Sequence, residues 1–399
     1  MTASLKPYLR PAVTLGLVCA LAACGGGGSD GWPEHRPPHP PAPPKLLYDV
    51  IPLNPRGETY GVINPHGINA DGKVTGHNFS DDGVRAFLYD GNRLFELGTF
   101  GGSSSQANGI NRCGHVTGWA MTKDELPQAF LYNGTLRNLG SLGGESVGYA
   151  ISNCGVVVGW SAVPGGDTHG FVHDGAMRDI GSFGGSSFAL SINSAGVVAG
   201  YSFLANSEAM RAFIYDSKGT GGLQSLGTLG GTRSLAEVIN DAGQVAGWSL
   251  NAEGLLRAFR YSGGVMQDLG TLDGTGTSEA THMNQAGVVV GNSTPQNGVQ
   301  HGFIHDGTAM RDLGTLGGLF SDAVAINAHG VVVGSSHNDT DPTERGFSWT
   351  AAEGMVDLNT RLHSPPLGLH ILRALAVSDN GSIAALSNQG LVLLKVRRH

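Results

Sequence analysis

Short apolar segments separated by turn-forming residues recur along the chain from residue 48 to its end. Eight of these segments run into the same phrase, Ile-Asn-x-x-Gly or a close variant, and successive copies lie 41 to 51 residues apart. The glycines that end the phrase are Gly72, Gly114, Gly155, Gly196, Gly243, Gly287, Gly330 and Gly381. A fixed period of this length predicts an array of supersecondary units that stack on their neighbours, because no unit can bury its own apolar face.

Each unit has the same order of short β-favouring pieces, and the third unit is an example. Its pieces are 149–151, 156–160, 170–173 and 177–180, and Asn, Asp and Gly separate them. These separators predict turns, because Gly adopts positive φ freely and Asn and Asp bond to nearby backbone. The mature chain has no helical apolar period. Four strands per repeat therefore predict an all-β fold, a β-propeller of four-stranded blades.

The two ends of the array predict how the ring closes. Residues 48–53 resemble a lone fourth strand, whereas 376–378, 382–386 and 390–396 supply only the first three strands of a unit. Together these remainders make one blade. We therefore expect eight blades, closed by the N-terminal strand joining the C-terminal three, with seven as the alternative count. Closure also removes exposed strand edges.

The repeated phrases resemble those of a known family. They include Arg85-Ala86-Phe87, His169-Gly170-Phe171, Arg211-Ala212-Phe213, His301-Gly302-Phe303 and Leu226-Gly227-Thr228-Leu229-Gly230-Gly231. On these phrases, residues 48–396 resemble the HAF-repeat family of extracellular bacterial repeat proteins. The departures are Ser152 and Ser378 in the Asn place of the turn, and Gly390-Leu391 where Ala-Phe is expected. The resemblance implies repeat structure and location, and it implies no activity.

Residues 1–23 predict a lipoprotein signal peptide. Lys6 and Arg10 precede an apolar run, 13–20, that is too short to span a bilayer, and Leu21-Ala22-Ala23-Cys24 then resembles a bacterial lipobox. This resemblance implies cleavage before Cys24 and acylation of that residue, and Gly25 after it favours the outer membrane, on its periplasmic or surface side. An ordinary cleaved signal is the alternative. Residues 24–46, rich in Gly and Pro, are expected to be a tether, and 47–399 the propeller.

The net charge of the chain restricts the classes of molecule that it can bind. Loss of the leader removes Lys6 and Arg10 and no acidic residue, so the formal net charge changes from -8 to -10, which argues against nucleic acid. We expect a monomer that meets the membrane through its lipid anchor.

Cys113 and Cys154 directly precede the turn glycines of adjacent units. An oxidising compartment would let them form a disulfide if their Cα atoms approach to about 4.4–6.8 Å, and the pattern leaves this pairing open.

Motifs with catalytic or metal-binding potential have structural explanations. Ser146 lies in a Gly-x-Ser-x-Gly sequence, but it also belongs to a Ser column that follows Gly-Gly in other units, and no strand-to-helix turn is expected there. The pairs His169 with His173 and His301 with His305 lack the third and fourth ligands that a metal ion needs. The sequence therefore predicts no catalytic residue, no cofactor and no metal site.

One aromatic column stands out from this background. Trp119, Trp160, Tyr201 and Trp248 each directly follow the second glycine of Gly-x-Val-x-Gly, in four consecutive units. In a ring, this places an arc of aromatic side chains on one side. Such rings stack on sugars or enter partner pockets, so the arc is a candidate ligand-binding surface. The alternative is that the rings fill space between blades.

These patterns favour a non-catalytic binding or interaction scaffold at the cell envelope, with a protein or glycan ligand. One alternative is a carbohydrate-active lyase or hydrolase with its active site in the propeller funnel. It would need acids, bases or metal ligands from several blades that converge on the channel. The other alternative is a structural envelope protein, which would have neither an exposed aromatic arc nor a charged funnel.

Overall fold

Each repeat forms four short antiparallel strands, because its apolar runs are brief and a turn-forming residue ends each of them. The computed structural model describes residues 46–54, 57, 60–81, 83–296, 298–339 and 343–397. These belong to one unit, Lys45–His399. The signal peptide, Cys24 and residues 24–45 of the tether lie outside the described residues. Among the described residues, no helix is long and apolar enough to cross a membrane.

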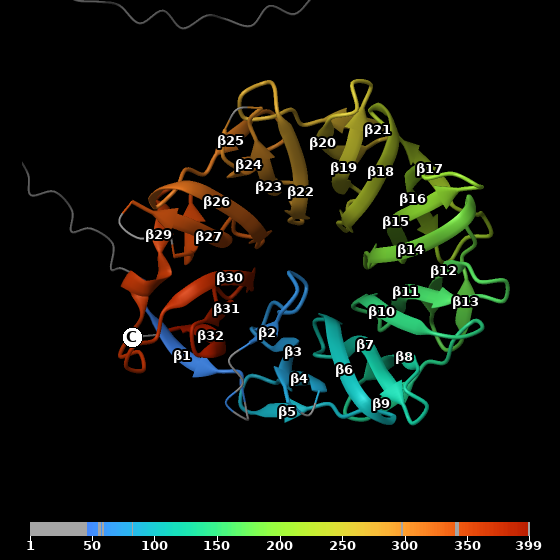
Figure 1. The fold of residues 1–399 in the computed structure, drawn as a ribbon, viewed down its shortest axis with the longest axis horizontal. Coiled ribbons are helices and arrows are strands. Elements are labelled where there is room, and N and C mark those ends of the chain that lie inside the picture. Colours follow the sequence, from blue (N-terminus) through green and yellow to red (C-terminus); the bar gives the residue numbers. More distant parts are fainter. Residues whose placement is uncertain are drawn as a thin grey trace, which may run out of the picture. The chain divides into compact units, whose positions relative to one another are not determined.

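The first strand of each blade lies next to the ring axis, and the others follow outward (Figure 1). The inner strands are β2 (Gly61–Val62), β6 (Gly101–Ile110), β10 (Ser146–Ile151), β14 (Gly184–Ile192), β18 (Gly230–Ile239), β22 (Thr277–Met283), β26 (Gly317–Ile326) and β30 (Ile371–Val377). The second strands are β3 (Val74–Ser80), β7 (Val116–Thr122), β11 (Val157–Ala162), β15 (Val197–Leu204), β19 (Val245–Asn251), β23 (Val289–Thr294), β27 (Val332–Asn338) and β31 (Ile383–Ser387).

The third and fourth strands complete the blades toward the outside of the ring. The third strands are β4 (Gly83–Tyr89), β8 (Pro127–Tyr132), β12 (Thr168–His173), β16 (Met210–Asp216), β20 (Leu256–Ser262), β24 (His301–His305), β28 (Arg345–Thr350) and β32 (Gly390–Val396). The fourth strands are β5 (Leu94–Glu96), β9 (Leu136–Asn138), β13 (Met177–Asp179), β17 (Gln224–Gly227), β21 (Val265–Asp268), β25 (Met310–Asp312), β29 (Gly354–Asp357) and β1 (Tyr48–Pro52), and one 3-10 turn, η1 (Leu358–Arg361), follows β29.

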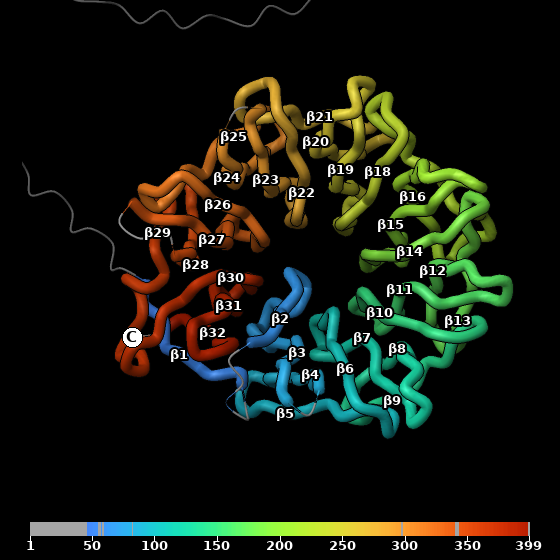
Figure 2. The backbone as a smooth tube through the Cα atoms, viewed as in Figure 1, coloured from blue at the N-terminus to red at the C-terminus, as the bar shows by residue number. Residues whose placement is uncertain are grey.

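The blade count and the closure of the ring are as predicted. Six sheets have four strands each, and blades 4 and 5 form one larger sheet because Met210 of β16 pairs with Arg233 of β18. The N-terminal strand β1 pairs antiparallel with β32, from Tyr48 opposite Val396 to Pro52 opposite Val392. In Figure 1 the blue β1 accordingly lies beside the red β32, and the tube in Figure 2 follows the same closure. The fold is therefore an eight-bladed β-propeller.

The hydrophobic core lies between neighbouring blades. In one cluster, Val158 and Val172 of blade 3 pack with Ala189, Val198 and Phe213 of blade 4. The Ala-Phe phrase explains this arrangement, because its phenylalanine is fully buried in seven blades: Phe87, Phe130, Phe171, Phe213, Phe259, Phe303 and Phe347. Each blade thus buries its apolar residues only against the next blade, which explains why the repeat must form an array.

Close contact between the inner and second strands explains the second glycine of Gly-x-Val-x-Gly. A Cβ atom at Gly247 would lie 2.0 Å from the carbonyl oxygen of Leu235, which is far inside van der Waals contact. Phe259 of the third strand lies opposite Gly247 in the strand register.

In blade 8 the register places Ala385 opposite Val392. The phenylalanine position is therefore taken by Val392, and the expectation that Leu391 takes it is wrong.

The Asn-x-x-Gly turns are joined around the ring by their asparagine side chains. Each turn glycine has positive φ, from +75° at Gly243 to +91° at Gly196, which only glycine adopts freely. Within a turn, the asparagine Oδ1 accepts a backbone N–H, as Asn240 does from Gln244 at 2.9 Å. Its Nδ2 then donates to the main chain of the next turn. These bonds are Asn69 to Asn111, Asn111 to Ser152, Asn193 to Asn240, Asn240 to Asn284, Asn284 to Asn327 and Asn327 to Ser378.

This asparagine ladder stops at the two serines that depart from the repeat. The Ser152 hydroxyl accepts the N–H of Val156 at 3.1 Å, and Ser378 accepts that of Ser382 at 3.1 Å. Among the described residues, neither serine donates to the turn of the next blade. A hydroxyl has no second polar atom that could bond within the turn and also reach the neighbour.

Replacing Ser152 with asparagine is therefore expected to stabilise the protein. The new amide can accept from Val156 and donate to the carbonyl of Asn193, and one added hydrogen bond contributes about 1 kcal/mol to the free energy of unfolding. Denaturant unfolding of wild type and Ser152→Asn measures the change. Ser152→Ala, which removes the bond to Val156, is the control and should be less stable than wild type. Equal or lower stability of Ser152→Asn would contradict this account of the ladder.

Candidate functional site in the axial channel

Side chains on the inner strands of several blades converge in the central channel. On β18, Ser234, Ala236 and Val238 are buried, whereas Leu235 and Glu237 between them are partly exposed. Glu237 lies within electrostatic reach of Tyr149 on β10, Tyr201 on β15 and Glu279 on β22. Groups on four successive blades can approach one another in this way only in the space that their inner strands enclose.

Glu237 is the most perturbed carboxyl group in this channel. Burial first, and the negative charge of Glu279 second, raise the pKa of Glu237 to about 7. Among the described residues, Glu237 has neither a salt bridge nor a hydrogen bond that would offset this burial. Burial also raises the pKa of Tyr149, and the charge of Glu237 adds to that effect. Glu237 is thus a carboxyl group that gains or loses its proton near neutral pH, as a general acid or base must.

Aromatic rings of blades 3 and 4 contact one another, and one of them, Tyr201, lies within electrostatic reach of Glu237. The ring centroids of Trp160 and Phe188 lie 6.2 Å apart across the boundary between blades 3 and 4. Phe188 stacks on Tyr201 at 4.9 Å with an interplanar angle of 19°. Trp160, Phe188 and Tyr201 are all partly exposed. These aromatic side chains are therefore partly accessible.

The four residues of the predicted aromatic arc occupy equivalent positions on second strands. Each lies directly opposite a residue of its inner strand: Trp119 opposite Gln106, Trp160 opposite Val147, Tyr201 opposite Phe188 and Trp248 opposite Leu235. All four are partly exposed. Ring contacts connect Trp160 and Tyr201 through Phe188; among the described residues, none connects Trp119 or Trp248 to them. Their role in ligand binding stays a prediction.

The opposite side of the channel has a charged pair with a structural role. Arg373 of β30 donates to Asp322 of β26 at 2.6 Å, and it also lies 3.5 Å from Glu344. Asp322 is buried and accepts two further bonds from Ser335, one from its N–H and one from its hydroxyl, both at 2.8 Å. This carboxylate is therefore fully engaged, in contrast to Glu237.

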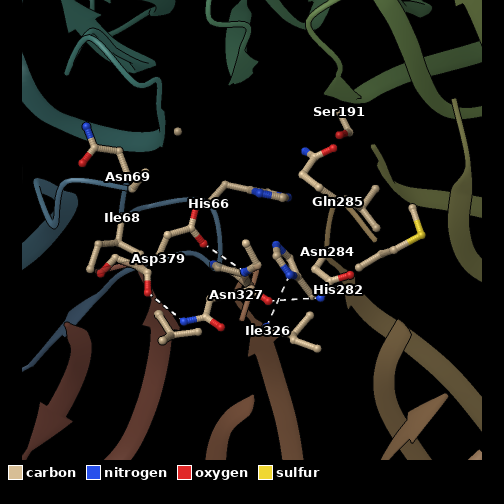
Figure 3. Close-up of a pocket in the computed structure, with 18 of the residues that line it drawn as sticks. His66, Ile68, Asn69, Ser191, His282, Asn284, Gln285, Ile326, Asn327 and Asp379 are labelled. Atoms are coloured by element: carbon tan, nitrogen blue, oxygen red, sulfur yellow. Dashed lines mark hydrogen bonds between the residues drawn. The ribbon is translucent and has the colours of Figure 1, made fainter. Parts of the chain in front are cut away.

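A cavity of about 290 Å³ opens at the end of the channel where the Asn-x-x-Gly turns lie (Figure 3). His66 and His282 approach each other there from blades 1 and 6, with ring centroids 5.1 Å apart. Burial lowers the pKa of His66, and burial and His66 together lower that of His282 to about 3, so both rings are neutral. Glu237 does not line this cavity, and the asparagines that do are occupied by the ladder.

The serine and histidine motifs of the sequence make hydrogen bonds that hold the blades together. The Ser146 hydroxyl donates to Gly140 at 2.6 Å and accepts from the N–H of Ala129 at 2.8 Å, as the equivalent serines do in other blades. His169 bonds to Asp179 and His301 to Asp312, each at 2.8 Å. No group of three or more potential metal ligands occurs among the described residues.

Cys113 and Cys154 are both exposed and have free thiols in this structure. Their turns are adjacent, since the N–H of Arg112 donates to Asn153 at 3.1 Å. The disulfide thus stays a prediction for the oxidised protein.

The sequence missed the two residues with the clearest potential for chemistry, Glu237 and Glu279. Both lie in inner-strand columns where other blades have unrelated residues, such as Asn108 and Leu190 in the place of Glu237. Two acids at such positions in consecutive repeats were the available signal. Their convergence became visible only when the blades were arranged around one axis.

Comparison with known proteins supports the fold. No protein-family model matches the chain, and no curated protein matches it. Among solved structures, Porphyromonas gingivalis dipeptidyl peptidase 4 is similar at 11% identity, with a TM-score of 0.51, over 86% of this chain and 60% of that chain. A structure from a study of two prolyl endopeptidases is similar at 10% identity, with a TM-score of 0.50, over 85% and 54% of the two chains. The β-propeller domain of the Trilobed protease from Pyrococcus furiosus matches at 12% identity, with a TM-score of 0.49, over 77% and 99%.

These comparisons correct the function expected from the sequence. The prediction of a non-catalytic binding or interaction scaffold is wrong, because the two similar structures with TM-scores of 0.51 and 0.50 are those of peptidases, which are hydrolases. The chain spans 60% of the dipeptidyl peptidase 4 structure, and identities of 10% and 11% establish the fold alone. The reaction must therefore be argued from the residues of the channel.

Proposed function

We propose that the chain is a hydrolase that cleaves a carbohydrate in the axial channel, with Glu237 as general acid and Glu279 as the second carboxyl group. The observation that carries this proposal is the position of Glu237, where groups of four blades converge and where burial, and then the charge of Glu279, raise its pKa to about 7. A carboxyl group with that pKa is partly protonated at neutral pH. It can therefore donate a proton to a leaving oxygen.

Two carboxyl groups are sufficient for glycoside hydrolysis. Glu237 would give its proton to the glycosidic oxygen, and the bond from this oxygen to the anomeric carbon would break, so that the leaving sugar departs as an alcohol. The negative charge of Glu279 would stabilise the positive charge that develops on the remaining sugar. A water molecule would then add to the anomeric carbon and lose its proton to a carboxylate.

The aromatic side chains next to Glu237 support a carbohydrate rather than a peptide as substrate. The faces of Trp160 and Tyr201 carry negative quadrupole potential, which suits the C–H faces of sugar rings.

A panel of polysaccharides and peptides tests the proposed function. The purified full chain would be incubated with each, and new reducing ends or new amino groups would be measured between pH 5 and pH 9. We expect reducing ends from one or more glycans, with a rate that falls as the pH rises above about 7 and Glu237 loses its proton. Release of amino groups alone, or no release from any substrate, would contradict the proposal.

We also propose that the protein belongs to the HAF-repeat proteins and is anchored by lipid to the bacterial outer membrane. The repeated Ala-Phe and Leu-Gly-Gly phrases support the first part. The lipobox-like sequence that ends at Cys24, with Gly25 after it, supports the second. Several acyl chains on one residue give durable anchoring, since each buried methylene contributes about 0.8 kcal/mol.

Replacing Cys24 with serine is expected to abolish acylation and release the protein from membranes. The substitution removes the thiol that carries the lipid. Labelled palmitate incorporation and membrane sedimentation in a bacterial host measure both effects. Cys113→Ser is the control and should keep the label. Retained label in Cys24→Ser would contradict the anchor and favour an ordinary signal peptide.

A further inference from the structure

A row of aromatic rings crosses blades 3 and 4, and its middle member, Tyr201, lies within electrostatic reach of Glu237. It begins with Trp160 and Phe188 and continues through Tyr201, which stacks on Phe188. Phe203 extends the row, because its ring centroid lies 5.9 Å from that of Tyr201 in a T-shaped arrangement. We name these four residues the aromatic track. All four are partly exposed, so the track is not fully enclosed in the core.

The far end of the track opens into a hollow at the loop between β15 and β16. Phe203 lines this hollow together with Asn206, Ser207, Glu208 and Arg233. Arg233 already has partners there, since its Nη2 lies 2.6 Å from the Glu208 carboxylate and its Nε donates to the Glu208 carbonyl at 3.0 Å. The polar groups at this end are therefore neutral as a set.

One inner strand connects the hollow to the carboxyl pair. Arg233, Leu235 and Glu237 occupy alternate positions of β18, and all three are partly exposed while the residues between them are buried. Alternate residues of a strand lie on one face. At about 3.3 Å per residue, the path from Arg233 to Glu237 is about 13 Å long, which is enough for about two or three sugar rings.

We propose that the aromatic track binds an uncharged linear polysaccharide and guides it from the hollow at Phe203 to Glu237. This inference rests on the proposed function and adds the class of substrate and its path. Aromatic faces recognise the C–H faces of successive sugars without charge. An acidic glycan fits less well, because Glu237 lies within electrostatic reach of Tyr201 in the track and the net charge of the chain is -8. Recognition along the track would make cleavage depend on chain length.

Disaccharides and hexasaccharides of the cello-, xylo-, manno-, malto- and chito- series are the probes for this inference. For the series that the full chain cleaves, kcat/KM is measured for both lengths, and their ratio gives the advantage of the longer chain. We expect wild type to prefer the hexasaccharide and Phe203→Ala to lower this advantage about tenfold. Phe79→Ala is the matched control, because Phe79 of β3 occupies the same strand position in blade 1, outside the track. It should keep the wild-type ratio.

The outcomes separate this inference from the proposed function. Cleavage with an unchanged ratio in Phe203→Ala, or with equal loss in Phe79→Ala, would overturn the track and leave the hydrolase. If no glycan is cleaved, the proposed function fails, and calorimetric titration of each hexasaccharide into wild type and Phe203→Ala still decides the track. Binding that is lost only in Phe203→Ala supports it. Equal binding, no binding, or binding only of charged hexuronate oligomers overturns it.

Discussion

Glu237→Gln is expected to lower the rate of glycan hydrolysis by about 10²- to 10⁴-fold, because the amide cannot donate the proton that the leaving oxygen needs. The substitution nearly preserves volume, and Glu237 has no hydrogen bond among the described residues that would be lost. The KM value should change little, since the loss concerns the chemical step. Initial rates on the cleaved glycan measure the effect. A rate within threefold of wild type would exclude Glu237 as the general acid.

The second carboxyl group allows a sharper test through the pH profile. The charge of Glu279 helps to raise the pKa of Glu237 to about 7. Glu279→Gln should therefore lower the rate and also move the alkaline limb of the profile to lower pH. Glu145→Gln is the control, because Glu145 lies on the exposed loop before β10. A rate loss in Glu279→Gln without a shift of the limb would mean that the two groups do not interact.

Glu237 also makes the stability of the fold depend on pH. Its pKa is about 7 in the folded protein, above the ordinary glutamate value of 4.5, so the folded state binds the proton more tightly than the unfolded state. The contribution of this bound proton to the free energy of unfolding is fully present below about pH 4.5 and is lost as the pH rises through about 7. At pH 8, Glu237→Gln should therefore be more stable than wild type by about 1–3 kcal/mol, while it is nearly inactive. A gain in stability with a loss of activity distinguishes a catalytic acid from a structural residue.

Phe259→Ala is expected to cost about 3–5 kcal/mol of the free energy of unfolding. Phe259 is fully buried at the contact between blades 4 and 5, with Ala199, Ala236 and Val245 in its cluster. Truncation removes most of a buried ring and leaves a cavity that the close-packed blades cannot fill. Equilibrium denaturation in urea measures the loss.

Phe259→Val is the informative control, because blade 8 has Val392 at the equivalent position. It should cost clearly less than Phe259→Ala, since valine keeps part of the buried surface. If both variants unfold with the same free energy as wild type, the Ala-Phe phrase would have a role other than packing.

The architecture could be predicted from the sequence because each turn of the repeat requires particular residue types. Gly243 and its equivalents need positive φ, and Asn240 needs an amide that bonds in two directions, so both residue types recur at fixed positions. The unmatched strands at the two ends then implied the pairing of β1 with β32. The irregular eighth blade was harder to predict. The sequence suggested Leu391 at the position of the buried phenylalanine, but Val392 occupies it, because Val392 is the residue that pairs with Ala385.

The candidate site could not be predicted in the same way, since it depends on positions where the repeats differ. Trp160 and Tyr201 were found because aromatic residues recur in one column. Glu237 and Glu279 occupy different positions within their repeats, and Phe188 occupies the position of Glu279 in another blade. Their proximity arises from the curvature of the ring, which brings unequal positions of successive blades to the same axis. The raised pKa of Glu237 is likewise a property of the enclosed channel.

The gaps in the asparagine ladder also affect where neighbouring blades can separate locally. The ladder bonds run without interruption from blade 1 to blade 3 and from blade 4 to blade 8, and they are missing at the two boundaries after Ser152 and Ser378. Separation at these boundaries breaks no ladder bond, so local opening costs less there than elsewhere. We therefore expect two arcs of unequal length, joined at two hinges that open more easily than the other boundaries. One hinge lies between blades 3 and 4, where the aromatic track crosses from one arc to the other.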